Sequence, residues 1–275
     1  MKKTKAKNYS WIIFDKFARY GLTALLGVVL VGESVGAVGK NAGVEIAQQQ
    51  ENIQVDTTRT EAKRLTDEGH RLFQKGTAES LKQALGKFKS ALELWRKLGD
   101  KQWQATNMHR IGYIYDLLGD KRQALKFYNQ ALPLRREIGD KSGQATTLNN
   151  IGNVYEDLGD KQQALKFKNQ ALPLKREVGD KTGQAKILNG IGGVYSELGD
   201  KQQALKYYNQ ALPLSREVED KKQEATTLNG IGFVYDSSGD KQQALKFYNL
   251  ELLLRREIGD KSAEATTLYN IGLIY

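Results

Sequence analysis

The sequence predicts an all-α fold, an α-solenoid of stacked helix–turn–helix units, and two observations support this expectation. The text ATTLNNIGNVYEDLGDKQQALKFKNQALPLKREVGDKTGQ at residues 145–184 returns every 40 residues, at 105–144, 185–224 and 225–264, and begins again at 265. Gly-Asp-Lys punctuates the same region every 20 residues, with one exception. An internal period of this length indicates stacked supersecondary units rather than one closed core.

Each unit contains two helices, and each helix has one apolar face. In the unit at 145–184, spacings of three and four residues define the face of the first helix: Leu148, Ile151, Gly152, Tyr155 and Leu158. The second helix has an equivalent face: Ala164, Phe167, Ala171, Leu174 and Val178. Neither helix can bury its face alone, so neighbouring units must stack.

The Gly-Asp-Lys corners have the chemistry of a helix end followed by a helix start. Glycine takes the left-handed conformation that ends one helix, and the aspartate after it caps the next helix. Glu219 stands where the other corners have glycine. If Glu219 adopts the same conformation, its side chain makes that conformation costlier by about 1 kcal/mol.

The apolar and small residues of the unit also match a known signature. Leu148, Ile151-Gly152, Tyr155, Gly159, Ala164 and Ala171 lie at the spacing of the tetratricopeptide repeat. Over roughly residues 60–275 the chain resembles that family, with five matching units and part of a sixth. The resemblance implies a right-handed superhelix. The 40-residue form is similar to the repeats of kinesin light chain and Pins-type scaffolds, and to repeat regions of bacterial proteins that end in a caspase-like CHAT peptidase domain.

One departure from the repeat lies in the second helix of the third unit. Lys168 replaces the aromatic residue found at Tyr128, Tyr208 and Tyr248. We therefore expect looser packing in this unit.

Residues 1–37 have the features of an export signal or a membrane anchor. A basic start is followed by the twelve-residue apolar run Gly21 to Gly32 and by an acceptable cleavage site at Val35-Gly36-Ala37. A membrane-spanning helix needs about 20 apolar residues. We expect a cleaved signal peptide and an exported bacterial protein, periplasmic or secreted to the extracellular side. One alternative is an uncleaved anchor, which would be the only expected contact with a membrane. The other is a cytosolic amphipathic tail.

The segment between this signal and the repeats has no apolar period. Residues 38–58 are therefore expected to form a flexible linker before the repeat array at 59–275. The first unit, about residues 59–99, is atypical because Gly-Thr-Ala-Glu-Ser-Leu-Lys at 76–82 adds three residues. We expect these residues to lengthen the corner between its two helices.

The last stretch, ATTLYNIGLIY, repeats the first-helix pattern without a partner helix after it. We expect its apolar residues to leave one flank exposed: Leu268, Ile271, Ile274 and Tyr275. A solenoid usually covers such an end. The interpretations left open are a truncated or split reading frame, a partner or second copy stacked on this flank, and an imperfect cap.

The resemblance places the functional surface on the concave face, which first helices mainly form. Counted from the repeat starts at 105, 145, 185 and 225, the fifth position holds His109, Asn149, Asn189 and Asn229. We call these residues the fifth-position column. Stacked asparagines offer donors and acceptors to the amide groups of an extended peptide, and they resemble the peptide-contacting asparagines of kinesin light chain. The alternative is that they bond to neighbouring helices or face water.

Other positions complete the predicted peptide-binding groove. At the ninth position, Tyr113 and Phe233 could anchor apolar ligand groups, and Asn153 lies between them in sequence. Lys186 replaces a threonine of the other repeats and could attract an acidic ligand residue. The alternative is that Lys186 is a solvated helix lysine without a role in binding, because single exposed charges contribute little interaction energy.

Composition excludes several function classes. The net charge of +10 is spread over alternating basic and acidic residues, which argues against nucleic acid and favours an acidic protein partner. No cysteine is present, and His70 and His109 lack metal-ligand spacing. We therefore expect no enzyme activity, metal or cofactor. The sequence predicts a protein-interaction scaffold; the alternative is a regulatory repeat region of a CHAT peptidase system.

Overall fold

The structure, a computed structural model, describes residues 38–275 of the chain. The described residues belong to two units, which divide between Glu51 and Asn52. The predicted export signal at residues 1–37 lies outside the described residues. Within them there are eleven helices and no strand, so the prediction of an all-α fold is confirmed.

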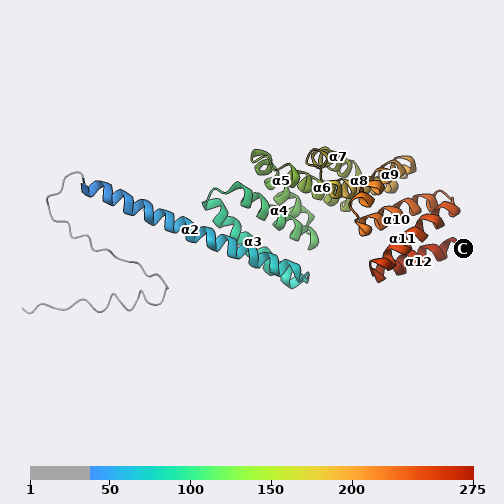
Figure 1. The fold of residues 1–275 in the computed structure, drawn as a ribbon, viewed down its shortest axis with the longest axis horizontal. Coiled ribbons are helices and arrows are strands. Elements are labelled where there is room, and N and C mark those ends of the chain that lie inside the picture. The colour runs from blue at the N-terminus through green and yellow to red at the C-terminus, as the bar shows by residue number, and fades with distance from the viewer. Residues whose placement is uncertain (1–37) are drawn as a thin grey trace, which may run out of the picture. The chain divides into compact units, whose positions relative to one another are not determined.

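The helices follow one another at short intervals (Figure 1). Their bounds are α2 Val38–Gln74, α3 Ala78–Lys97, α4 Lys101–Leu117, α5 Lys121–Glu137, α6 Lys141–Asp157, α7 Lys161–Glu177, α8 Lys181–Glu197, α9 Lys201–Glu217, α10 Lys221–Ser237, α11 Lys241–Glu257 and α12 Lys261–Ile274. From α4 to α11 every helix has 17 residues. No helix among the described residues is long and apolar enough to cross a membrane.

The unit Asn52–Tyr275 is a stack of helix pairs. The most extensive contacts join α4 to α5, α6 to α7, α8 to α9 and α10 to α11, and each pair packs against the next. The first helices α4, α6, α8 and α10 also contact one another in order. They form one layer, and the second helices form the other. We call the solvent-facing side of α4, α6, α8 and α10 the first-helix face.

The corners between helices use one residue for two purposes. At the end of α4, Gly119 has a φ of 83°, and the backbone N–H of Asp120 donates to the carbonyl of Tyr115 over 2.9 Å. The Asp120 side chain then accepts from the N–H of Gln123, the third residue of α5. This arrangement ends one helix and caps the next. Glu219 occupies the same left-handed region, with a φ of 55°, so the condition attached to its expected cost is met.

Helical glycines allow the two helices of a pair to approach closely. A Cβ atom at Gly112 would lie 2.9 Å from the Tyr128 ring, and one at Gly192 would lie 2.9 Å from the Tyr208 ring. Both distances are too short for a side chain. The aromatic residue of the second helix therefore lies directly on the glycine of the first, as the tetratricopeptide signature implies.

The structure corrects two expectations about the start of the array. Residues 38–58, expected to be a flexible linker, are helical and belong to α2. The corner between α2 and α3 has three residues, as at the later corners, and Thr77 caps α3. The three additional residues lengthen α3 to 20 residues instead. They add most of one helical turn to α3 relative to the 17-residue helices, so their backbone groups are hydrogen-bonded within the helix.

The exposed flank expected at α12 is only partly present. Ile274 is buried, and Ile271 packs with it against Tyr248 of α11. Leu268 and Tyr275 are exposed, as predicted. The expectation was wrong for the two isoleucines because they lie on the side of α12 that contacts α11.

Candidate functional site

Much of the fifth-position column is hydrogen-bonded to the following repeat. The Nδ1 atom of His109 on α4 lies 3.1 Å from Thr147 Oγ1 on α6. Asn189 on α8 donates from Nδ2 to Thr227 Oγ1 on α10 over 2.7 Å, and it is only 8% exposed. These two residues therefore link successive first helices. Bonding to a neighbouring helix was the alternative to peptide contact for this column.

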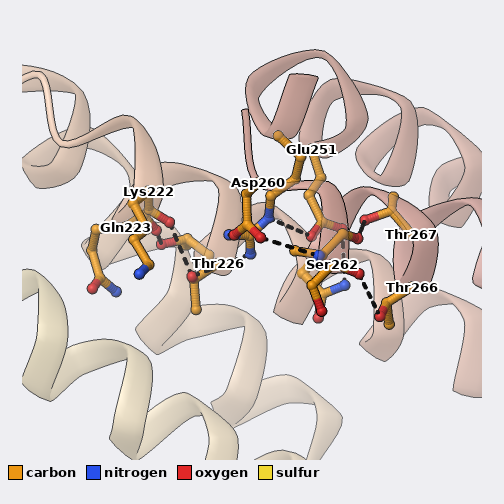
Figure 2. A network of polar contacts seen from close by, with 12 residues as sticks. Lys222, Gln223, Thr226, Glu251, Asp260, Ser262, Thr266 and Thr267 are labelled. Atoms are coloured by element: carbon orange, nitrogen blue, oxygen red, sulfur yellow. Dashed lines mark hydrogen bonds and ion pairs between the residues drawn. The ribbon is translucent and has the colours of Figure 1, made fainter. Parts of the chain in front are cut away.

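Asn229 belongs to a partly buried network that joins α10, α11 and the N-cap residue of α12. Its Nδ2 donates to Glu251 Oε2 over 2.9 Å, and Glu251 Oε1 accepts from Arg255 Nε over 3.1 Å. Arg255 also donates to Asp260 Oδ2 and Thr226 Oγ1. Figure 2 shows Thr226, Glu251 and Asp260 in this network. Because buried charges require paired and hydrogen-bonded partners, the network commits Asn229 to packing.

Asn149 on α6 is the exception in the column. The residue on α8 that corresponds to Thr147 and Thr227 is Ile187, which has no hydroxyl group. The Asn149 side chain makes no hydrogen bond with any residue that the structure describes. Its Oδ1 atom is buried and unpaired, as is that of Asn189, but Asn189 is engaged through Nδ2, whereas neither end of the Asn149 amide has a partner. A buried amide oxygen without a partner is uncommon in folded proteins and calls for an explanation.

Asn149 lines a cavity between α6 and α8, which we call the α6–α8 pocket. Its volume is about 270 Å³, and its lining includes Asn149, Asn150, Lys175, Asp180, Lys186 and Ile187. The sequence predicted Asn149 and Lys186 as site residues, and the structure brings these two together. The other four were missed. Ile187 could have been found, since it interrupts a threonine column of the repeat.

The charges in the α6–α8 pocket sum to one positive charge. Lys175 is buried and donates from Nζ to Asp180 Oδ2 over 2.6 Å and to Ser142 Oγ over 3.2 Å. Burial opposes ionisation of Asp180, but the hydrogen bonds from Lys175 and from the Gly183 N–H outweigh it and lower the pKa of that carboxyl. Lys186 is exposed and has no ion-pair partner among the described residues. Its charge is therefore available to a ligand.

The ninth-position residues differ in what they offer. Tyr113 on α4 is 38% exposed and its ring lies 5.7 Å from that of Phe73, while Phe233 on α10 is 53% exposed. Neither belongs to the lining of the α6–α8 pocket. Asn153 on α6 accepts a hydrogen bond from Lys168 Nζ, so its carbonyl oxygen is already engaged.

Lys168 on α7 corrects the expectation of looser packing in the third unit. The residue is 2% exposed, and its Nζ lies 3.0 Å from Glu156 Oε2. Its aliphatic chain packs against Gly152, where the tyrosines of the other repeats pack their rings. A lysine fits here because its stem replaces the apolar ring and its charged end has two polar partners.

His109 is held in the neutral state. Burial, followed by the positive charges of Arg135 and Arg110, lowers the pKa of its imidazole to about 3. The Thr147 hydroxyl donates to the Gly143 carbonyl, so it accepts from His109, and this assigns the proton to Nδ1. The other nitrogen, Nε2, lies 3.4 Å from Asn150 Nδ2 and can accept from it. His109 thus contributes to packing rather than to acid–base chemistry.

The arrangement offers recognition chemistry. The first-helix face combines amide groups, the exposed Lys186 and exposed aromatic rings on one layer of helices. Within residues 38–275 no group of three histidine or acidic residues could hold a metal ion.

A sequence profile described as tetratricopeptide repeat matches residues 77–137, 143–217 and 183–252, which together cover more than half of the chain. A comparison with curated proteins gave no match.

Solved structures share this fold at low sequence identity. The apo form of RapI has a TM-score of 0.72 and 18% identity over 78% of this chain and 77% of RapI. A Podospora anserina protein with nearly identical repeats of the kinesin light chain type has a TM-score of 0.59 and 12% identity over 72% of this chain and 98% of its own. NprR, solved with its cognate peptide NprX, has a TM-score of 0.56 and 23% identity over 75% of this chain and 58% of NprR.

Proposed function

Because the chain belongs to the tetratricopeptide repeat family, we propose that it is a protein-interaction scaffold that binds a peptide or protein segment on its first-helix face. The observation that carries this proposal is the unpartnered Asn149 amide in the lining of the α6–α8 pocket. A bound polypeptide would supply the partner that this amide lacks, since a peptide group is both donor and acceptor.

Two further observations support a polypeptide ligand. The exposed Lys186 and the net positive charge of the pocket favour an acidic segment. NprR, which shares the fold, was solved with a peptide bound. In this arrangement the exposed rings of Tyr113 and Phe233 contact the ligand on either side of the pocket, while His109, Asn189 and Asn229 hold the face together.

The experiment that tests the proposal uses peptides selected on the full chain from a random-peptide library. Asn149→Ala should weaken their binding by about tenfold, because a hydrogen bond in a desolvated site contributes about 1.4 kcal/mol. Lys186→Thr, which restores the residue of the other repeats, should weaken acidic peptides most. Asn229→Ala is the matched control for asparagine loss outside the pocket. Unchanged affinity in Asn149→Ala would remove this residue from the site.

We also propose that the protein acts outside the cytoplasm, on the basis of the basic and apolar pattern in residues 1–37. The intact mass of the native protein tests this proposal. A mass lower by residues 1–37 supports export by a cleaved signal, and the presence of these residues supports one of the two alternatives, an uncleaved anchor or a cytosolic tail. A mass well above 30.8 kDa would instead favour the alternative in which the array regulates a peptidase domain.

A further inference from the structure

Side chains of the second helices extend between the first helices, and the next repeat covers their ends to different degrees. Arg110 of α4 lies over the Phe88 ring, 5.9 Å from its centroid. Asn150 of α6 lies beside the hydroxyl group of Tyr128, which is fully buried and makes no hydrogen bond with any described residue. These covering residues occupy the sixth position of the repeat. In α8 and α10 the sixth position is glycine, which has no side chain to cover the end of the residue beneath it.

Beneath these glycines lie Lys168 of α7, which already has polar partners, and Tyr208 of α9. Tyr208 is 7% exposed, and its hydroxyl makes no hydrogen bond with any residue in the described part of the chain. A Cβ atom at Gly230 would lie 2.9 Å from this hydroxyl, and one at Gly193 would lie 3.8 Å from it. Gly193 occupies the ninth position, whose residues Tyr113 and Phe233 are exposed. The hydroxyl therefore reaches the first-helix face.

Packing explains one of these glycines but not the other. At Gly230 any side chain would collide with the Tyr208 ring, since a Cβ atom would lie 2.5 Å from it. At Gly193 a Cβ atom would meet only the Tyr208 hydroxyl, at an ordinary contact distance. Glycine within a helix is less stable than alanine. Gly193 thus keeps space open above the hydroxyl at a cost to the helix.

The electrostatics of this place suit a neutral hydrogen-bonding group. Burial, followed by the charges of Glu156 and Glu197, raises the pKa of Tyr208 to about 12, so its hydroxyl stays protonated and can donate. Nearby, Lys168 and Glu156 form an ion pair and offset each other's charge. The hydroxyl can donate to a carbonyl oxygen, and glycine permits the close approach of another backbone.

We propose that the main chain of an extended polypeptide lies across Gly193 and Gly230, where one of its carbonyl oxygens accepts a hydrogen bond from Tyr208. This inference rests on the proposed function and extends the binding surface from the α6–α8 pocket toward α10. It makes Tyr208, a residue of the second-helix layer, a contact of the ligand.

The test measures the affinity of fluorescently labelled peptides selected on the wild-type full chain from a random-peptide library. Tyr208→Phe keeps the ring and removes the hydroxyl, and it should weaken binding by about tenfold. Gly193→Ala should weaken binding to a similar extent while raising the melting temperature, because alanine is the better helix former. Tyr128→Phe and Gly86→Ala are the matched controls. The first removes a buried hydroxyl, and the second adds a methyl group where no atom lies within 4 Å.

Each outcome decides the matter. Weaker binding in Tyr208→Phe and Gly193→Ala, with both controls unchanged, supports the inference. Unchanged affinity in both variants overturns it and leaves the proposed function in place. Equal loss in Tyr128→Phe assigns the effect to repeat packing and also overturns it. A library that yields no peptide for the wild-type chain overturns both the inference and the proposed function.

Discussion

Asn149 of α6 and Ile187 of α8 line the same cavity, and this pair interrupts a column of hydrogen bonds between first helices. One repeat earlier His109 contacts Thr147, and one repeat later Asn189 donates to Thr227. Isoleucine in place of threonine therefore leaves both ends of the Asn149 amide without a partner among the described residues, whereas His109 and Asn189 each keep one. A near-identical repeat acquires a distinct site in this way.

Restoring the column should close the site. Ile187→Thr is expected to provide Asn149 with a hydroxyl partner and to weaken the binding of selected peptides by about tenfold. The free energy of unfolding should change by no more than about 1 kcal/mol, because the new hydrogen bond offsets the lost methyl contacts. Fluorescence anisotropy of labelled peptides measures the affinity, and urea unfolding measures the free energy of unfolding. Ile187→Val is the control, since it removes volume without adding a hydroxyl, and equal weakening there would contradict the explanation.

Replacing the strained corner residue should stabilise the fold. Glu219 has a φ of 55°, a conformation that glycine adopts at the equivalent corners. Glu219→Gly is expected to raise the free energy of unfolding by about 1 kcal/mol. Urea unfolding measures the gain. Glu219→Ala keeps a Cβ atom and should show no comparable gain; equal stabilisation by alanine would mean that backbone strain is not the cause.

Acid should destabilise the protein in part through His109. Its pKa is about 3 in the folded state, against about 6.5 in an unfolded chain. Between these values the unfolded chain binds a proton that the folded protein does not. The neutral side chain therefore stabilises the fold fully above pH 6.5 and progressively less as the pH falls toward 3.

His109→Asn, which introduces the residue of the next three repeats, should reduce this acid sensitivity. Between pH 7 and pH 4.5 the wild type should lose about 2 kcal/mol more stability than the variant. Chemical unfolding at both pH values measures the difference. Identical losses would show that His109 titrates normally in the folded protein. The same measurement on His70→Asn shows how much of the acid sensitivity comes from the other histidine.

The buried Lys168 should depend on its acidic partner. Glu156→Ala leaves a buried ammonium group with only the Asn153 carbonyl as a partner, and should destabilise the protein by about 2 kcal/mol. Lys168→Tyr introduces the residue of the other repeats, and Gly190 leaves room for its ring, as Gly230 does for Tyr208.

We expect Lys168→Tyr to be neutral or stabilising, and the double variant with Glu156→Ala to be more stable than Glu156→Ala alone. Thermal and urea unfolding of the four proteins completes the cycle. A double variant as unstable as Glu156→Ala would show that Glu156 acts independently of the lysine.

Local chemistry made the architecture predictable from sequence. The corner at Gly119 and Asp120 depends on a left-handed glycine and a capping carboxylate, and both act within a few residues. The helix pairs follow from apolar spacing of three and four. Glu219 could be placed in the left-handed region because its neighbours in the repeat are glycines. Residues 38–58 were wrongly predicted as a flexible linker because the prediction of helices relied on an apolar period, which this helical stretch lacks.

The sequence by itself determined the repeat, the order of its helices and the first-helix positions, whereas only the tertiary structure decided which of those positions remain available. The partners of His109 and Asn189 lie 38 residues further along the chain. Whether each contact forms depends on the spacing between stacked helices. Lys168 likewise looked like a packing defect until the structure placed it against Gly152 and Glu156. Backbone conformation follows from neighbours in sequence, but hydrogen-bond partnership and burial follow from distances between repeats.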